Sequence, residues 1–248
     1  MRRLWCVIRA LWRLARLGLH LVWGMIQVLR LRWVSAEKRA GIIARWLRRL
    51  PALAGVHVAY PEQTPPQCCL LVANHSSWLD IPVLGGMAER VVFLSKAQIR
   101  RWPVVGFLAQ VAGTVFIQRG RGAGIAAQAI HDTLDINQRM LIFPEGTTTD
   151  GLKVRRFHSR LFQAAIDAQV PVQPVAVRYF DAENNRTTIA AYTNQTSLMR
   201  SLWSVLLAER LTVSVQLLTP VDAGVATSRD ELAYSTQQAI AEQVNTED

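Results

Sequence analysis

The stretch from Cys68 to Asp80 reads Cys-Cys-Leu-Leu-Val-Ala-Asn-His-Ser-Ser-Trp-Leu-Asp, and it decides the fold. Its first part, Cys68–Ala73, is apolar at every position, as expected of a strand buried on both faces of a sheet. Its second part, Asn74–Asp80, is polar and leads into a helical pattern. A fully buried strand followed directly by a helix predicts an α/β protein with a mostly parallel central sheet.

The same alternation continues along the chain after residue 50. Six more strands are predicted at Val56–Tyr60, Val91–Leu94, Thr114–Gln118, Met140–Phe143, Val172–Tyr179 and Leu211–Leu218. Helical patterns cover Trp78–Gly86, Ala123–Asn137, Arg160–Ala168, Leu198–Glu209 and Ser228–Val244. We therefore expect one α/β domain over residues 51–248, with helices flanking the sheet. Reactive groups in such sheets gather in the loops just past the carboxyl ends of the strands.

The composition excludes several classes of protein. Half of the 248 residues are hydrophobic and 19% are charged, which is too apolar for a disordered chain and too charged for a multi-span membrane protein. The three cysteines (Cys6, Cys68 and Cys69) provide neither a disulfide framework nor metal-ligand spacing. We expect a reducing compartment and no metal site.

Charge and tryptophan are concentrated at the N-terminus. Residues 1–49 hold twelve Lys and Arg against one acidic residue, whereas residues 50–248 hold sixteen against seventeen, and five of the eight tryptophans precede residue 50. On a helical wheel of residues 2–32, the basic and polar side chains share about a third of the circumference and large apolar side chains fill most of the rest. A second amphipathic helix is expected from Ser35 or Ala36 to Leu50, ended by Pro51. Residues 1–50 are thus predicted to form a two-helix motif that docks on an anionic membrane surface.

The longest uncharged stretch, Leu17–Leu29, has thirteen residues, fewer than the roughly twenty apolar residues of a membrane span. We therefore expect monotopic or peripheral attachment. One alternative is that both helices pack on the domain core and their arginines are merely solvated. Another is nucleic-acid binding, which the wide apolar face disfavours because nucleic acid offers that face no place to be buried.

His75 and Asp80 are the candidate catalytic residues. A histidine that takes a proton from an alcohol needs a partner that fixes its tautomer and stabilises its imidazolium form. Asp80 follows one helical turn later and can reach the ring, so the pair suits general-base catalysis. On spacing alone, a purely structural His75 is the simpler alternative. The chain has no G-x-S-x-G elbow and no nucleotide-binding glycine loop.

Two further loops carry candidate binding residues. Gly113–Arg119 ends in an arginine placed to hold an anionic headgroup, although a surface arginine in a polar turn fits as well. In Phe143–Thr149, Pro144 and the following glycine let the backbone turn sharply. There Glu145 can accept a hydrogen bond from a substrate hydroxyl or pair with Arg119, or simply occupy a turn.

Together these loops resemble the lysophospholipid acyltransferase superfamily, in particular the bacterial 1-acyl-glycerol-3-phosphate acyltransferases. The resemblance covers about residues 65–180 and includes four ordered blocks: Asn74–Asp80 (NHx₄D), Gly113–Arg119 (GxxFIxR), Phe143–Thr147 (FPEGT) and Val170–Val175 (VP[IV]xPV). Ser95-Lys96 and Trp102–Gly106 resemble the segment that leads into the second block.

The resemblance implies a glycerolipid acyltransferase-like fold and a one-step reaction without a cofactor. A fatty acyl group would pass from acyl carrier protein (acyl-ACP) or acyl-CoA to the free hydroxyl of lysophosphatidic acid, giving phosphatidic acid. His75 would be the base and Asp80 its orienting partner. Substrate-binding positions carried over from the family's blocks are Arg119, Glu145, Gly146, Thr147, Lys96 and Pro171, the last near the acyl donor. The enzyme would act at the cytoplasmic face of the bacterial inner membrane.

Two departures bear on the acceptor. Thr148 stands where the family often has Arg, and Gln118 where it often has an acid or Asn. Losing a cation weakens the case for lysophosphatidic acid, unless Arg155, Arg156 or Lys153 compensates. We rank lysophosphatidic acid first and lyso-ornithine lipid, whose acyltransferases also resemble this superfamily, a close second. An inactive lipid-binding protein of the membrane surface is an alternative of another class, but it would have no reason to retain His75 with Asp80.

Overall fold

The computed structural model describes residues 2–118, 123–136, 138–193, 196–224 and 228–246. Its centre is a seven-stranded sheet of strand order β1-β7-β6-β2-β5-β3-β4, parallel except for the antiparallel pair β6–β7. The strands are β1 (Val56–Ala59), β2 (Cys69–Ala73), β3 (Val91–Lys96), β4 (Val115–Ile117), β5 (Arg139–Ile142), β6 (Val172–Phe180) and β7 (Leu211–Leu217). The predicted fold class and all seven predicted strands are confirmed.

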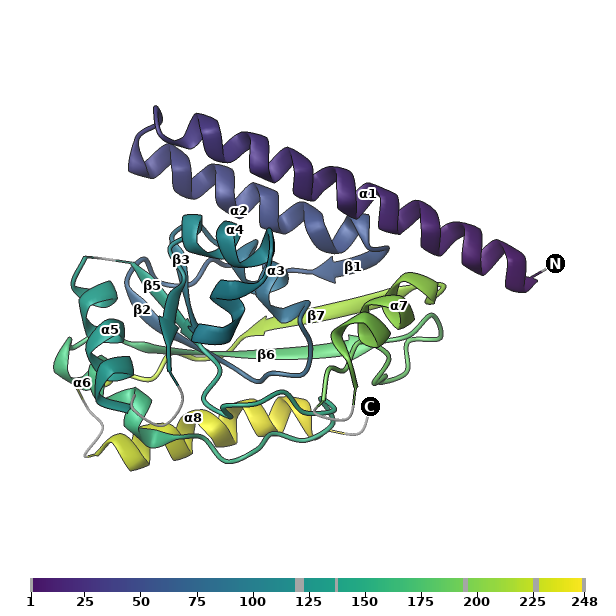
Figure 1. The fold of residues 1–248 in the computed structure, drawn as a ribbon. Coiled ribbons are helices and arrows are strands. Elements are labelled where there is room, and N and C mark those ends of the chain that lie inside the picture. Colours follow the sequence, from purple (N-terminus) through teal and green to yellow (C-terminus); the bar gives the residue numbers. More distant parts are fainter. Residues whose placement is uncertain (1, 119–122, 137, 194–195, 225–227, 247–248) are drawn as a thin grey trace.

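Helices cover both faces of the sheet (Figure 1). They are α1 (Arg2–Leu31), α2 (Ala36–Leu53), α3 (Asp80–Gly85), α4 (Val105–Val111), α5 (Ala123–Asp135), α6 (Gln163–Asp167), α7 (Leu198–Leu207) and α8 (Arg229–Val244), with 3-10 turns η1 (Ala97–Arg101) and η2 (Ser159–Phe162). Side chains of β2 alternate between two cores: Leu71 packs in the core of α3 and α7, whereas Leu70 and Val72 pack in the core of α5, α6 and α8. All five residues of β2 are buried, as predicted from their continuous apolar run.

One prediction about a helix end is wrong, and one helix was not predicted. Pro51 does not end α2, which continues to Leu53 and is followed by Gly55 at a φ of +83°. Pro51 lies inside the last turn of α2, where it cannot donate the helical hydrogen bond to the carbonyl of residue 47. The sequence also gave no indication of α4, since Pro103 and Gly106 interrupt its apolar pattern.

The two N-terminal helices form a hairpin that lies across one side of the molecule (Figure 1). Arg9 and Arg13 of α1 face the body rather than lipid or solvent. Arg9 donates to the carbonyl oxygen of Leu207 at 2.8 Å. Arg13, only 9% exposed, donates to three carbonyl oxygens at the end of α7, those of Leu206, Ala208 and Glu209. A guanidinium is favourable there because the carboxyl end of a helix carries partial negative charge.

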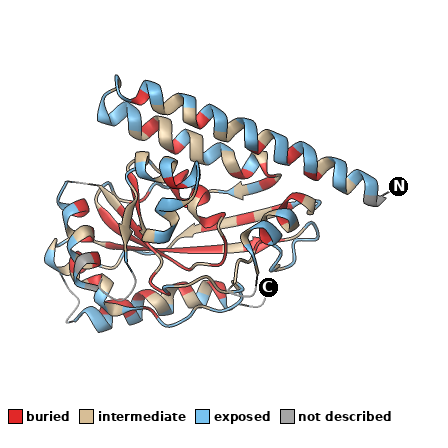
Figure 2. Cartoon of the chain, in the orientation of Figure 1, coloured by how far each residue is buried: buried red, intermediate tan, exposed pale blue. Residues whose placement is uncertain are grey.

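The opposite face of α1 is apolar and exposed (Figure 2). Its exposed large side chains are Leu4, Trp5, Val7, Ile8, Leu11, Trp12, Leu14, Leu19, Val22, Trp23, Ile26 and Leu29. By length and composition Leu4–Leu31 is sufficient to cross a membrane, with a mean hydropathy of 1.2. The expectation that α1 is too short to span a membrane counted only the thirteen uncharged residues Leu17–Leu29, whereas this longer stretch includes arginines. We call this exposed surface the outer face of α1.

Candidate active site

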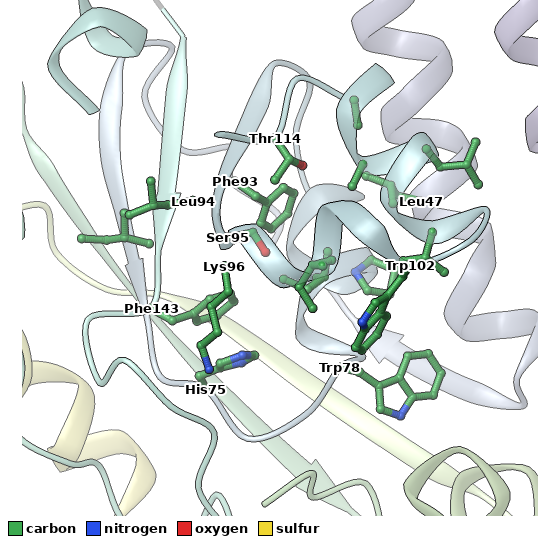
Figure 3. A pocket seen from close by; sticks show the side chains of 18 of the residues that line it. Leu47, His75, Trp78, Phe93, Leu94, Ser95, Lys96, Trp102, Thr114 and Phe143 are labelled. Atoms are coloured by element: carbon green, nitrogen blue, oxygen red, sulfur yellow. The ribbon is translucent and has the colours of Figure 1, made fainter. Parts of the chain in front are cut away.

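A cavity of about 1650 Å³ opens where β2, β3 and β5 end, beneath the N-terminal hairpin. Parallel strands bring their carboxyl ends to one edge of a sheet, which is why loops distant in sequence meet there. Residues of α1 and α2, including Leu17, Leu21 and Trp46, form one apolar wall. Figure 3 shows residues on the cavity wall from β3 and from the loops after β2 and β5. The hairpin therefore forms one wall of the site, which was not predicted from the sequence.

His75 and Asp80 lie in contact at the wall of this cavity, with His75 on its surface and Asp80 behind it. The ring Nδ1 of His75 lies 2.8 Å from Asp80 Oδ2. The Asp80 side chain is fully buried, whereas that of His75 is 19% exposed and lines the cavity. With Nδ1 bonded to the carboxylate, Nε2 is the ring nitrogen that can receive a proton from a bound hydroxyl.

The loop that carries His75 is fixed on several sides. Asn74 binds the backbone of Val177 on β6 with both ends of its amide, accepting from the N–H at 2.8 Å and donating to the carbonyl at 2.9 Å. The His75 ring stacks on Phe143 with ring centroids 3.9 Å apart and an interplanar angle of 15°. Thr149 donates its backbone N–H to the His75 carbonyl at 2.9 Å. These contacts restrict both the backbone and the ring of His75.

Glu145 lines the cavity, but its carboxylate is bound to backbone. Oε1 accepts the N–H of His75 at 2.8 Å and Oε2 accepts the N–H of Arg155 at 2.9 Å. Burial raises the pKa of Glu145, although these two backbone bonds and His75 oppose the rise. The side chain thus links the His75 loop to the loop around Arg155, whereas we had expected a contact to substrate or to Arg119.

Four of the described basic residues line the cavity. Among the described residues that line it, Lys96, Arg155, Arg156 and Arg160 are basic and Glu145 alone is acidic. Lys96 stands at the end of β3, as Figure 3 shows. Thr148, which replaces the family's arginine, donates its hydroxyl to the carbonyl of Tyr192. Arg155, Arg156 and Arg160 therefore provide positive charge at the cavity wall, where Thr148 does not.

Gly146 and Thr147 also line the cavity. Gly146 has a φ of +69°, and a Cβ there would lie 3.1 Å from His158 Nε2. Glycine adopts this conformation readily. It also has no side chain, which leaves room for the His158 ring beside the backbone of residue 146.

One predicted residue that the structure describes, Pro171, is not brought to the cavity. Pro171 lies before β6, and its carbonyl accepts the N–H of Leu70 at 3.0 Å. That is the opposite end of the parallel strands from His75, and Pro171 is not among the cavity-lining residues. Arg119 lies outside the described residues.

One site residue was missed. The hydroxyl of Tyr179, on β6, donates to Asp80 Oδ1 at 2.5 Å. Nothing in the local sequence marks this tyrosine, because the contact joins positions 99 residues apart. Over the described part of the chain, no group of three or more His, Cys, Asp or Glu side chains could hold a metal ion.

Comparison with known proteins agrees with the site. A family model described as Acyltransferase matches residues 55–178. The chain is 43% identical over 196 residues to the lyso-ornithine lipid O-acyltransferase of Pseudomonas aeruginosa, covering 79% of this chain and 75% of that protein. It is 34% identical over 235 residues to the 1-acyl-sn-glycerol-3-phosphate acyltransferase of Neisseria gonorrhoeae, covering 92% and 91% of the two chains. The crystal structure of the 1-acyl-sn-glycerophosphate acyltransferase PlsC from Thermotoga maritima shares the fold, with a TM-score of 0.74, 21% identity and coverage of 98% and 96%.

Proposed function

Since this chain belongs to the acyltransferase family, we propose that it transfers a fatty acyl group from a thioester to the hydroxyl of a lyso-lipid in one step. The observation that carries the proposal is the His75–Asp80 pair, 2.8 Å apart, at the wall of a large cavity. Apolar residues of α1 and α2 and four basic side chains line the cavity, which suits an amphiphile whose headgroup carries an anionic group.

The reaction follows from the position of the ring. His75 Nε2 accepts the proton of the acceptor hydroxyl as its oxygen attacks the thioester carbonyl. The new C–O bond forms, the C–S bond breaks, and the leaving thiolate takes the proton from the imidazolium. Asp80 accepts the hydrogen bond of Nδ1–H and stabilises the positive ring. No acyl-enzyme is required.

Two acceptors have support. Lyso-ornithine lipid is favoured by the relative at 43% identity and by Thr148, whose hydroxyl is directed to Tyr192 where the family often has a cation. Lysophosphatidic acid is favoured by the Neisseria relative and by the four basic residues of the cavity. We place lyso-ornithine lipid first, because the relative with the higher identity carries that name. Acyl-ACP or acyl-CoA would serve as donor, with no other cofactor.

We place the protein on the cytoplasmic face of a bacterial inner membrane, with the outer face of α1 in the lipid interface. Arg9 and Arg13 bond to α7 and hold α1 along the body, which favours a helix lying in the interface over one that crosses the bilayer. Nucleic acid is disfavoured, since the exposed side of α1 is apolar.

The test is an acceptor panel with purified protein. Lyso-ornithine lipid, lysophosphatidic acid and other lyso-lipids are each offered with one acyl-ACP and one acyl-CoA, and the acylated products are identified by mass. We expect His75→Ala to lower kcat by about 10²- to 10⁴-fold, the usual contribution of a general base. His57→Ala, on the exposed side of β1, is the matched control and should leave kcat unchanged. Acylation of lysophosphatidic acid alone would select the second acceptor, and activity of His75→Ala equal to that of the unmodified protein would disprove the mechanism.

A further inference from the structure

The Asp80 carboxylate is held on both of its oxygens. Oδ2, which faces His75, also accepts the backbone N–H groups of Ser76 at 2.8 Å and Ser77 at 2.9 Å. Oδ1 faces away from the ring and accepts the hydroxyl of Tyr179 at 2.5 Å. A buried carboxylate needs such donors, because the charge loses its hydration. The donors to Oδ2 come from its own loop, whereas Tyr179 comes from a different strand.

Tyr179 is itself rigidly placed. It is 4% exposed and packs with Val175 and Val177 in the core on the α3 and α7 side of the sheet. Val177, two residues earlier, makes the two backbone bonds to Asn74. Asn74 directly precedes His75. Strand β6 therefore holds the start of this loop through Val177 and holds Asp80 Oδ1 through Tyr179.

The hydroxyl remains a donor under all ordinary conditions. Burial and the nearby charge of Asp80 raise the pKa of Tyr179 well above its usual value of 10.0, while a hydrogen bond with Ser77 acts in the opposite direction. Tyr179 therefore keeps its proton wherever the enzyme is folded. It has no access to substrate, because its ring lies within the core.

We propose that Tyr179 is a positioning residue for acyl transfer: its hydroxyl fixes the rotation of the Asp80 carboxylate and takes up part of its charge. This inference rests on the proposed function, in which His75 is the base. With Oδ1 held by Tyr179, Oδ2 stays on His75 Nδ1 and keeps the ring aimed at the cavity. By sharing the charge, the hydroxyl also limits how strongly Asp80 favours the imidazolium over the neutral ring.

The experiment is Tyr179→Phe, which removes the hydroxyl and keeps the ring. We expect kcat to fall about tenfold, with the KM values of acceptor and donor within about twofold of those of the unmodified enzyme. We also expect the acidic limb of the kcat/KM profile to move to higher pH, because an unshared Asp80 charge stabilises the imidazolium. Among the described residues, the titratable groups that interact with Asp80 include His75, Tyr179 and Glu145, and His75 and Glu145 are unchanged in this variant.

Tyr60→Phe is the matched control. The Tyr60 hydroxyl is also buried but has no hydrogen-bond partner among the described residues, so its removal should leave kcat and the pH profile unchanged. Thermal melting of both variants separates a loss of stability from a loss of rate. A Tyr179→Phe variant that melts earlier but keeps the kcat and pH profile of the unmodified enzyme would overturn the positioning role. The proposed function would still stand if His75→Ala is inactive.

If Tyr179→Phe does not fold, site-specific replacement of Tyr179 by 3,5-difluorotyrosine keeps the ring and the hydroxyl while making the phenol more acidic. A stronger donor on Oδ1 should move the acidic limb of the profile to lower pH. The low-field proton resonance of His75 Nδ1–H should shift in the same variant. An unchanged profile together with an unchanged resonance would overturn the proposal.

Discussion

Glu145 binds two backbone N–H groups with its carboxylate, one of them that of His75. Glu145 is 5% exposed, and both of its hydrogen bonds are partly buried. Its main structural effect is to join two loops on the cavity wall. If Glu145 also binds substrate, its carboxylate must do so while it accepts the N–H groups of His75 and Arg155.

We expect Glu145→Ala to lower the free energy of unfolding by about 1–3 kcal/mol, because it removes the acceptor of two part-buried backbone donors. The loosened His75 loop should also lower kcat. Chemical denaturation monitored by circular dichroism measures the first effect, and the acyl-transfer assay the second. Glu62→Ala, at an exposed position, should change stability by less than about 0.5 kcal/mol. Equal stability of Glu145→Ala and the unmodified protein would show that the two bonds contribute nothing to the fold.

At single residues, the sequence was informative where contacts are local. His75 and Asp80 are five residues apart, and their pairing follows from one turn of chain. Tyr179 could not be found in the same way, because its partner is reached only through the register of β2 on β6. The two backbone bonds of Glu145 could not be predicted either, because backbone donors leave no trace in a sequence pattern.

Among whole elements, the strands were predictable because each is a short apolar run between turn residues. The sequence did not predict α4, which contains Gly106 and directly follows Pro103 and a residue, Val104, with a φ of +61°. The orientation of α1 was also not predictable. A helical wheel separates an apolar face from a basic face, but it does not show that arginines would cap α7 and leave the apolar side exposed.

The contact between α1 and α2 is centred on His20 and Trp46, and it should depend on pH. Their rings stack with centroids 4.9 Å apart, His20 Nε2 lies 3.0 Å from the Trp46 carbonyl, and the indole donates to the His20 carbonyl at 3.2 Å. Burial lowers the pKa of His20 below 6.5, although the bond to the Trp46 carbonyl partly opposes it. The folded chain therefore holds His20 neutral in a range where the unfolded chain is already protonated.

The neutral His20 therefore contributes fully to the stability of the folded chain above pH 6.5. This contribution decreases as the pH falls from 6.5 toward the lowered pKa of His20. Thermal melts between pH 5 and 8 should show a decline on the acidic side that is smaller in His20→Phe, which retains the stacking but cannot be protonated. His131→Phe, whose ring pairs with Asp135 on α5, is the comparison for a histidine outside the hairpin. A pH dependence in His20→Phe as steep as in the unmodified protein would assign the decline to other groups.

Over the whole molecule, the net charge of +10 overstates the basic surface available to a membrane. Two arginines of α1 are bound to α7, and the outer face of α1 is apolar. Attachment should therefore depend mainly on apolar insertion, to which each large side chain contributes on the order of 1.5–3 kcal/mol. The N-terminal hairpin also walls the cavity, so deletion of residues 1–50 would disturb the site as well as attachment.

Substitution of surface residues avoids that difficulty. The triple variant Trp12→Ser, Leu19→Ser and Ile26→Ser should lower partitioning onto anionic vesicles by at least about a hundredfold, while kcat on detergent-dispersed acceptor stays unchanged. High salt should release little of the unmodified protein. Ile136→Ser with Tyr234→Ser, both 64% exposed elsewhere, is the control and should bind vesicles normally. Normal vesicle binding by the triple variant would contradict insertion of α1.

The contacts of Arg13 have a geometric consequence for any lipid that approaches. Because one guanidinium holds three carbonyl oxygens at the end of α7, α1 cannot roll about its axis or swing outward without breaking all of them. The outer face of α1 and the cavity wall that α1 forms therefore keep a fixed orientation relative to each other. A bilayer that takes up the outer face of α1 therefore meets the cavity in a single orientation, which the contacts of Arg13 set.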